Sequence, residues 1–170
     1  QIKFLYFANA EKNEMIKTEG KFTYIEAGEG PPLILLHGLM GGVDNFGSMV
    51  DIVAGSGFKV LAPDLQLFEV PLLKTSIKYL AEYLNDFMQH KELEKAVLVG
   101  NSLGGHIGLY YTKNNLERVG GIVLAGSSGL YESAMGSGYT KRSDYNVMRA
   151  KVEEVFYDPA VATKEIVDDV

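Results

Sequence analysis

The stretch Lys95-Ala-Val-Leu-Val-Gly-Asn-Ser-Leu-Gly-Gly-His-Ile-Gly-Leu-Tyr-Tyr111 determines how the rest of the chain is interpreted. It opens with the apolar, β-branched run 96–99, which is typical of a buried strand. A glycine-rich turn follows, and an apolar pattern of helical spacing then continues to the end of the stretch. Ser102 lies at the apex of this turn, with Gly100 and Gly104 two positions away on either side. The stretch therefore predicts a strand, a sharp turn and a helix, with a serine between them.

The turn around Ser102 matches the G-x-S-x-G pattern of a nucleophile elbow. Such an elbow needs glycines because strand and helix pass so closely that Cβ atoms would clash, while the serine backbone is strained. The N-terminus of the following helix also favours negative charge that develops beside the serine. A plain glycine-rich turn is the alternative interpretation, but the strand–turn–helix context favours Ser102 as a nucleophile.

The composition is that of an ordinary globular protein. The 170 residues suffice for one domain with a core, and 46% of them are hydrophobic and 22% charged. The net charge of −6 and the lack of a basic cluster predict no nucleic-acid partner. The absence of cysteine excludes disulfides, thiolate metal sites and cysteine nucleophiles. No apolar run approaches the roughly 20 residues that span a bilayer, and no signal-peptide pattern is visible, so we expect no membrane partner and a cytoplasmic protein.

Apolar runs that alternate with helical patterns predict an α/β fold, with a mostly parallel sheet covered by helices on both faces. The strands are expected at residues 14–19 and 21–27 (a hairpin around Gly20), and at 33–36, 58–62, 96–99 and 119–125, the last of them buried. The helices are expected at residues 45–54, at 76–90 and after the elbow. Residues 28–32, with two glycines and two prolines, predict a turn.

Beyond residue 129 the pattern changes. Residues 130–143 are rich in serine, glycine and tyrosine and show no strand pattern. A helix capped near Ser143 is expected next, and a further helix begins near Thr163. We therefore divide the chain into residues 1–129 and residues 130–170.

Several motifs, met in the right order, resemble the α/β-hydrolase family. One apolar strand ends in His37-Gly38, the next ends at Asp64, and the elbow follows. The resemblance covers residues 20–129, and it implies that residues 1–129 are the N-terminal part of an α/β-hydrolase core. It also implies that residues 130–170 begin a helical cap or lid. The asparagine before the serine and the two glycines after the next residue are similar to those of esterases. They are also similar to those of the carbon–carbon hydrolases that cleave ring-fission products of aromatic degradation.

The resemblance implies a set of site residues. Ser102 would be the nucleophile of an acyl-enzyme, and the backbone N–H of Leu103 one arm of an oxyanion hole. The other arm would come from Leu39, with Met40 as the second choice. Fixed backbone donors stabilise the negative charge of the reacting carbonyl oxygen by roughly 3–4 kcal/mol each. No cofactor is expected, and three scattered histidines without carboxylates at suitable spacing predict no metal site.

A serine nucleophile also needs a base and an acid, and in this family both follow the serine along the chain. The only histidine after Ser102 in the sequence is His106. The family core with its cap usually needs about 250 residues. We therefore expect an N-terminal portion that lacks the acid and base of its triad and shows little or no turnover alone. His37 is expected to brace the oxyanion loop, and His106 to pack or to form a local hydrogen bond.

Four further polar residues receive structural interpretations. Asp64 follows a strand, where functional groups collect, but the capping of its own loop is the simpler role. His90 ends a surface helix and is expected to be solvated. Ser127 and Ser128 lie in a Gly-Ser-Ser-Gly turn that no helix follows, which predicts a hinge into the cap.

Two functional interpretations stay open. The first is a serine hydrolase that acts on a small-molecule ester or similar activated carbonyl, with carbon–carbon cleavage as its variant. The second is a non-catalytic binding module of the same fold. Nucleotide binding is disfavoured because no G-x-G-x-x-G follows a strand and no G-x-x-x-x-G-K-[ST] is present. An apolar sheet edge after the last strand predicts a homodimer or pairing with a C-terminal segment.

Overall fold

The computed structural model describes residues 16–39, 41–67, 76–130, 145–155 and 158–169. The chain divides into two compact units, residues 1–131 and residues 132–170. No helix in these described ranges is long and apolar enough to cross a membrane.

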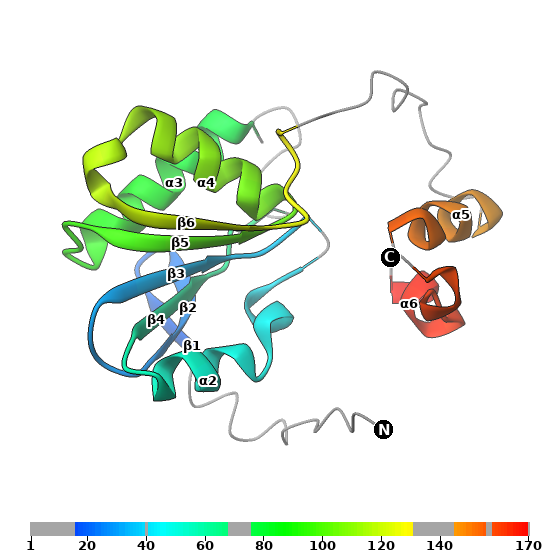
Figure 1. The fold of residues 1–170 in the computed structure, drawn as a ribbon, viewed down its shortest axis with the longest axis horizontal. Helices are drawn as coiled ribbons and strands as arrows, with labels where there is room; N and C mark the ends of the chain where they lie inside the picture. Colours follow the sequence, from blue (N-terminus) through cyan, green and yellow to red (C-terminus); the bar gives the residue numbers. More distant parts are fainter. Residues whose placement is uncertain (1–15, 40, 68–75, 131–144, 156–157, 170) are drawn as a thin grey trace. The chain divides into compact units, whose positions relative to one another are not determined.

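The first unit is built on one six-stranded sheet in the order β1-β2-β4-β3-β5-β6 (Figure 1). Its strands are β1 (Ile16–Glu19), β2 (Phe22–Ala27), β3 (Pro32–Leu36), β4 (Lys59–Pro63), β5 (Ala96–Asn101) and β6 (Val119–Ala125). The hairpin β1–β2 is antiparallel and joins β4 in antiparallel pairing, whereas β4, β3, β5 and β6 run parallel. The predicted hairpin and mostly parallel sheet are confirmed. Because parallel strands end at the same edge, the loops after all four meet there.

Helices cover both faces of the sheet, as predicted. Figure 1 shows α3 (Ile77–His90) and α4 (Leu103–Asn114) on one side and α2 (Met49–Gly55) on the other. Successive side chains of β3 alternate between the two faces. Ile34 and Leu36 join the core beneath α3 and α4, while Leu33 and Leu35 join the core beneath α2. The central strand is therefore apolar throughout because both of its faces are covered.

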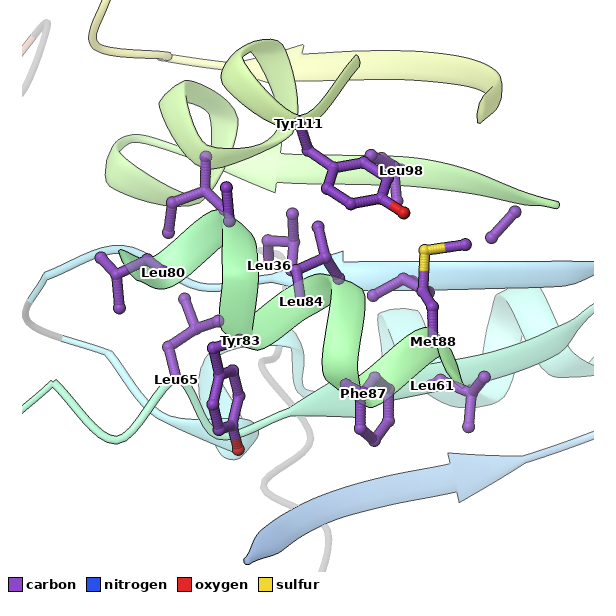
Figure 2. Close-up of a cluster of buried hydrophobic side chains, with 14 of the residues drawn as sticks. Leu36, Leu61, Leu65, Leu80, Tyr83, Leu84, Phe87, Met88, Leu98 and Tyr111 are labelled. Atoms are coloured by element: carbon purple, nitrogen blue, oxygen red, sulfur yellow. The ribbon is translucent and has the colours of Figure 1, made fainter. Parts of the chain in front are cut away.

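The core beneath α3 and α4 is the larger one (Figure 2). Residues of α3 at helical spacing enter it, namely Leu80, Ala81, Tyr83, Leu84, Phe87 and Met88. The Ser76 hydroxyl caps this helix by accepting a hydrogen bond from the Tyr79 N–H at 3.1 Å. The helix predicted for residues 76–90 is confirmed.

Three details of the predicted elements were wrong. Pro32 is the first residue of β3 rather than part of a turn, because a strand's first position tolerates the missing N–H. The helix expected at residues 45–54 is a 3₁₀ turn, η1 (Val43–Phe46), followed by α2. The strand β6 is only half buried, with Val123 52% exposed, because β6 lies at the edge of the sheet.

The second unit has a small core of its own. Its described elements are α5 (Tyr145–Val155), the 3₁₀ turn η4 (Pro159–Val161) and α6 (Lys164–Asp169). Val152, Ala162 and Val167 form its buried cluster. The two helices predicted for this region are confirmed, whereas the assignment of residues 130–170 to a cap remains a prediction.

Candidate active site

Ser102 lies in the turn between β5 and α4 and holds an unusual backbone conformation, with φ at 50° and ψ at −115°. Residues with a Cβ rarely adopt positive φ, and such strain costs about 1–3 kcal/mol. Among the described residues other than glycine, only Gln66, Glu92 and Ser102 have positive φ. The predicted elbow position is thus strained and exposed at the edge where the parallel strands end.

The glycines around Ser102 are required by close packing. A Cβ on Gly104 would overlap the carbonyl oxygen of Leu36, and a Cβ on Gly100 would overlap the backbone of Gly105. No larger residue fits at either position unless the strand and the helix move apart. The sequence spacing predicted the close approach of β5 and α4, whereas the contact of α4 with β3 at Leu36 was not predicted.

The loop after β3 lies next to the elbow. A Cβ on Gly38 would lie 3.3 Å from the Cβ of Ser102, and the Gly41 N–H donates to the Gly38 carbonyl at 3.1 Å. Leu39 is half exposed in this loop, and Met40 lies outside the described residues. In the described part of the chain, no hydrogen bond uses the N–H of Leu39 or of Leu103.

His37 is buried beneath this loop and is only 1% exposed. Its Nε2 accepts a hydrogen bond from the Leu65 N–H at 3.0 Å, which places the proton on Nδ1, 2.9 Å from the Gly38 carbonyl oxygen. Both ring nitrogens are therefore occupied, and His37 braces the loop as predicted. Asp64 accepts from the Gln66 N–H at 3.0 Å, so it caps its own loop.

The other two histidines also have structural contacts. The imidazole of His106 packs against Gly129, where a Cβ would overlap the ring, so its predicted packing role is confirmed. His90 is exposed at the end of α3, as expected, but it also makes contacts that were not predicted. Its Nε2 lies 3.0 Å from Glu19, and its ring centroid lies 5.0 Å from that of Phe22, because the end of α3 packs against the β1–β2 hairpin.

Within the described ranges, nothing completes a catalytic triad. The Ser102 hydroxyl makes no hydrogen bond to a described side chain, and no group of three metal-ligating side chains occurs there. A surface groove of about 320 Å³ runs between α3 and α4, but none of the predicted site residues lines it. The described site therefore consists of the elbow and the β3 loop.

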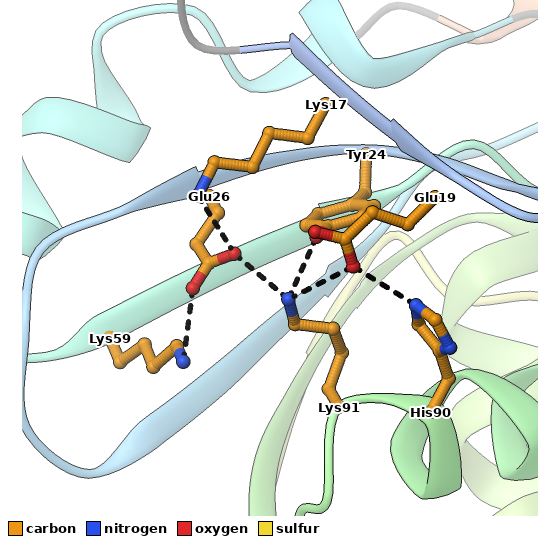
Figure 3. A network of polar contacts seen from close by, with 7 residues as sticks. All are labelled: Lys17, Glu19, Tyr24, Glu26, Lys59, His90 and Lys91. Atoms are coloured by element: carbon orange, nitrogen blue, oxygen red, sulfur yellow. Dashed lines mark hydrogen bonds and ion pairs between the residues drawn. The ribbon is translucent and has the colours of Figure 1, made fainter.

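A charged network that the sequence did not reveal ties the β1–β2 hairpin to β4 and to the residue after α3 (Figure 3). The Glu26 carboxylate lies 3.0 Å from Lys59, 3.1 Å from Lys91 and 3.2 Å from Lys17. Lys91 also donates to the Tyr24 hydroxyl at 2.7 Å. The network lies where β4 begins, whereas Ser102 follows the end of β5, so we assign it to stability.

The network changes the acidity of its members. Burial by itself would raise the pKa of Glu26, but hydrogen bonds from Lys59, Lys91 and Lys17 outweigh it and lower this pKa to about 2. Burial likewise opposes the charge on Lys91, yet its bonds to Tyr24 and Glu26 raise the pKa of Lys91 above its usual range. No local sequence pattern predicts this network, because its partners are far apart along the chain.

Comparisons with known proteins extend these observations. An alpha/beta hydrolase enzyme from the metagenome of sediments from the lagoon of Mar Chica, Morocco, is 52% identical, with a TM-score of 0.65; the match covers 69% of this chain and 53% of that one. The 2-hydroxy-6-oxo-6-(2'-aminophenyl)hexa-2,4-dienoic acid hydrolase of Metapseudomonas resinovorans is 34% identical over 114 residues, which is 63% of this chain and 39% of the relative.

A third relative is the dihydrolipoyllysine-residue acetyltransferase component of the acetoin cleaving system of Pseudomonas putida. It is 28% identical over 146 residues, which is 82% of this chain and 39% of the relative. The chain thus spans 39% of the length of both curated relatives and 53% of the solved enzyme.

The sequence profile of the alpha/beta hydrolase fold matches residues 31–157, most of the chain. With its sheet order and elbow, this match shows that the chain belongs to the alpha/beta hydrolase fold family.

Proposed function

We propose that the protein is a serine hydrolase that cleaves a small-molecule ester or similar activated carbonyl through an acyl-enzyme at Ser102. The strained backbone of Ser102 is the observation that carries this proposal. A positive φ at a serine between a parallel strand and a helix is the geometry that lifts a nucleophile above the sheet edge. The adjacent β3 loop, where a Cβ on Gly38 would lie 3.3 Å from the Ser102 Cβ, supports the same assignment.

In the proposed reaction the Ser102 hydroxyl loses its proton to a base while its oxygen attacks the carbonyl carbon. The carbonyl oxygen becomes negative and accepts hydrogen bonds from the N–H of Leu103 and from the N–H of Leu39, or of Met40 as the second choice. The N-terminus of α4 adds a favourable dipole. The leaving group departs with a proton, and water then hydrolyses the acyl-enzyme.

We assign the acid and the base of the triad to residues other than those described. Both ring nitrogens of His37 are occupied, by the Leu65 N–H and the Gly38 carbonyl, and among the described residues no hydrogen bond joins the Ser102 hydroxyl to the imidazole of His90 or His106. For a protein of these 170 residues alone we expect little or no turnover, because binding and an oxyanion hole would act without a base. We also assign residues 130–170 to the beginning of a cap over the site.

Carbon–carbon hydrolysis is the second candidate. The relatives include hydrolases of 2-hydroxy-6-oxo-6-phenylhexa-2,4-dienoate and of its 2'-aminophenyl counterpart. A non-catalytic binding module is the third, and it would keep the fold without a reactive serine.

Intact mass before and after treatment with a fluorophosphonate tests the proposal, on the protein expressed from its full reading frame. We expect one adduct, which Ser102→Ala abolishes and which Ser56→Ala, at an exposed serine beyond α2, retains. An unlabelled protein would support the binding module. Hydrolysis of p-nitrophenyl esters compared with that of 2-hydroxy-6-oxo-6-phenylhexa-2,4-dienoate then distinguishes ester from carbon–carbon cleavage.

A further inference from the structure

The last residue of β6 and the turn that follows it bond to both backbone polar groups of Ser102. The Ser102 N–H donates to the Ala125 carbonyl at 3.0 Å, and the Ser102 carbonyl accepts from the Ser128 N–H at 3.2 Å. The Ser128 hydroxyl lies 3.4 Å from the same carbonyl oxygen. Residues 125–129, here named the β6 turn, therefore hold the backbone on both sides of the Ser102 Cα.

The β6 turn is seated directly on the first turn of α4. A Cβ on Gly105 would overlap the hydroxyl of Ser127 and lie 2.7 Å from its Cβ. A Cβ on Gly129 would overlap the ring of His106. Within the turn, the Ser127 hydroxyl donates to the Ser128 carbonyl at 2.8 Å. Because no space separates these groups, the turn and the elbow cannot shift independently.

We propose that Ser128 is a positioning residue that fixes the carbonyl of Ser102 and thereby aims its hydroxyl. This inference rests on the proposed function of Ser102. The N–H groups of Gly105 and His106 also reach the Ser102 carbonyl, at 3.1 and 3.3 Å, but they belong to α4 itself. Ser128 is the donor to this carbonyl that comes from a different part of the fold, among the residues that the structure describes.

Physical chemistry explains why a second anchor matters. A strained backbone persists only where its surroundings over-determine it. The direction of the Cα–Cβ bond of Ser102 follows from that backbone, and a misplacement of about 1 Å can cost about 100-fold in rate. Ser128 supports reactivity in this way without touching the substrate.

The first test displaces the β6 turn with one substitution and restores its position with a second. Gly105→Ala places a methyl group against Ser127, and Ser127→Gly in the same chain removes the obstacle. The measurement is the second-order rate constant for fluorophosphonate labelling of Ser102 in the protein from its full reading frame. We expect Gly105→Ala to slow labelling about tenfold. We expect the double variant to recover to within about threefold of the parent.

Thermal unfolding of each variant separates positioning from folding. Alanine favours a helix more than glycine does, by about 1 kcal/mol, so a folded Gly105→Ala protein that labels slowly has a displaced turn. If Gly105→Ala does not fold, Ser128→Ala and Ser128→Thr provide the second test. Alanine removes the hydroxyl and should lower kcat about threefold with KM unchanged, whereas threonine should restore it. Ser56→Ala is the matched control.

Two labelling outcomes would each overturn the positioning role while Ser102 stays the nucleophile. They are parent-like labelling of a folded Gly105→Ala protein, and a folded double variant as slow as Gly105→Ala. Ser128→Ala kinetics identical to the parent's, where that test is needed, would do the same. An unlabelled parent protein would instead overturn the proposed function, and the positioning role with it.

Discussion

Ser102 combines a Cβ with a positive φ, and glycine is the residue that adopts such torsions without strain. Ser102→Gly and Ser102→Ala both remove the hydroxyl, so both should abolish fluorophosphonate labelling. The free energy of unfolding should nevertheless be about 1 kcal/mol higher for the glycine variant than for the alanine variant, because alanine retains the backbone strain. Urea denaturation measures the difference. Equal free energies of unfolding for the two variants would show that the backbone of Ser102 is relaxed.

Gly104 and Gly108 lie one turn apart on α4 but should respond oppositely to alanine. A Cβ on Gly104 overlaps the Leu36 carbonyl, so Gly104→Ala should destabilise the protein by about 3 kcal/mol or prevent folding. A Cβ on Gly108 meets Ile122 at an ordinary 3.4 Å, so Gly108→Ala should be neutral or stabilise by up to about 1 kcal/mol. Thermal and urea unfolding of the pair provide the measurement. Similar stabilities would contradict the close approach of α4 and β3.

Local close packing around Ser102 could be predicted from the sequence, whereas a hydrogen bond between distant loops could not. The glycine spacing around Ser102 predicted close packing, because only steric exclusion demands glycine at both positions. The bracing role of His37 was also predictable, but its partner Leu65 was not. That hydrogen bond joins loops 28 residues apart in the chain, and no local pattern fixes their approach.

Among the elements, the β1–β2 hairpin depends on Glu26 and its lysines. The pKa of Glu26 falls from its ordinary 4.5 to about 2 in the folded protein. A carboxyl group with a lowered folded pKa stabilises the fold above its unfolded pKa, and this contribution disappears as the pH falls from about 4.5 to about 2. Glu26→Gln should therefore lower the free energy of unfolding at pH 7 by roughly 1–2 kcal/mol, allowing for solvent screening.

Urea denaturation of the parent and of Glu26→Gln between pH 7 and pH 2.5 measures this contribution. The variant should lose less stability than the parent below pH 4.5, because its amide does not titrate. Glu82→Gln is the control. Glu82 is exposed and lies 3.9 Å from Lys78, and such an exposed ion pair contributes little to the free energy of unfolding. Parallel stability curves for the parent and Glu26→Gln would exclude a lowered pKa at Glu26.

Elements differed in how well their sequences predicted them. The helix α3 was predicted closely, since its apolar stripe is regular and Ser76 marks its start. The strand β6 was predicted to be buried, because its apolar sequence resembles that of the inner strands. Its exposure follows from its place at the end of the strand order, which depends on the whole sheet and not on residues 119–125.

At the scale of the whole molecule, β6 is the last strand in the order of the described sheet, and Val123 is 52% exposed. We expect a protein of these 170 residues to form a homodimer through this edge, unless a C-terminal segment pairs with it. Val123→Lys should shift the equilibrium toward monomer, whereas Ile52→Lys, at an exposed position on α2, should not. Sedimentation velocity over a range of concentrations measures this. A parent protein that stays monomeric throughout would rule out association of the edge.

The α/β class was predictable because alternating strand and helix patterns admit few arrangements. The elbow geometry at Ser102 was predictable because the strand, the turn and the helix that form it are adjacent in sequence. The contact between the β6 turn and the elbow was not, since Ser128 lies 26 residues beyond Ser102 and reaches it only in the folded sheet. The charged network around Glu26 was also unpredictable, because its residues are distant in sequence and meet only in the folded sheet.

The pairing order of β3 has a consequence for the protein's synthesis. Leu33 pairs with Val60 on one side and with Val97 on the other, so the central strand gains its second neighbour some sixty residues after it is made. At about 5–20 residues per second, the apolar strand β3 would wait several seconds with one edge open. A nascent chain in this state is the form most exposed to aggregation, and the one that a chaperone on the ribosome would have to shield.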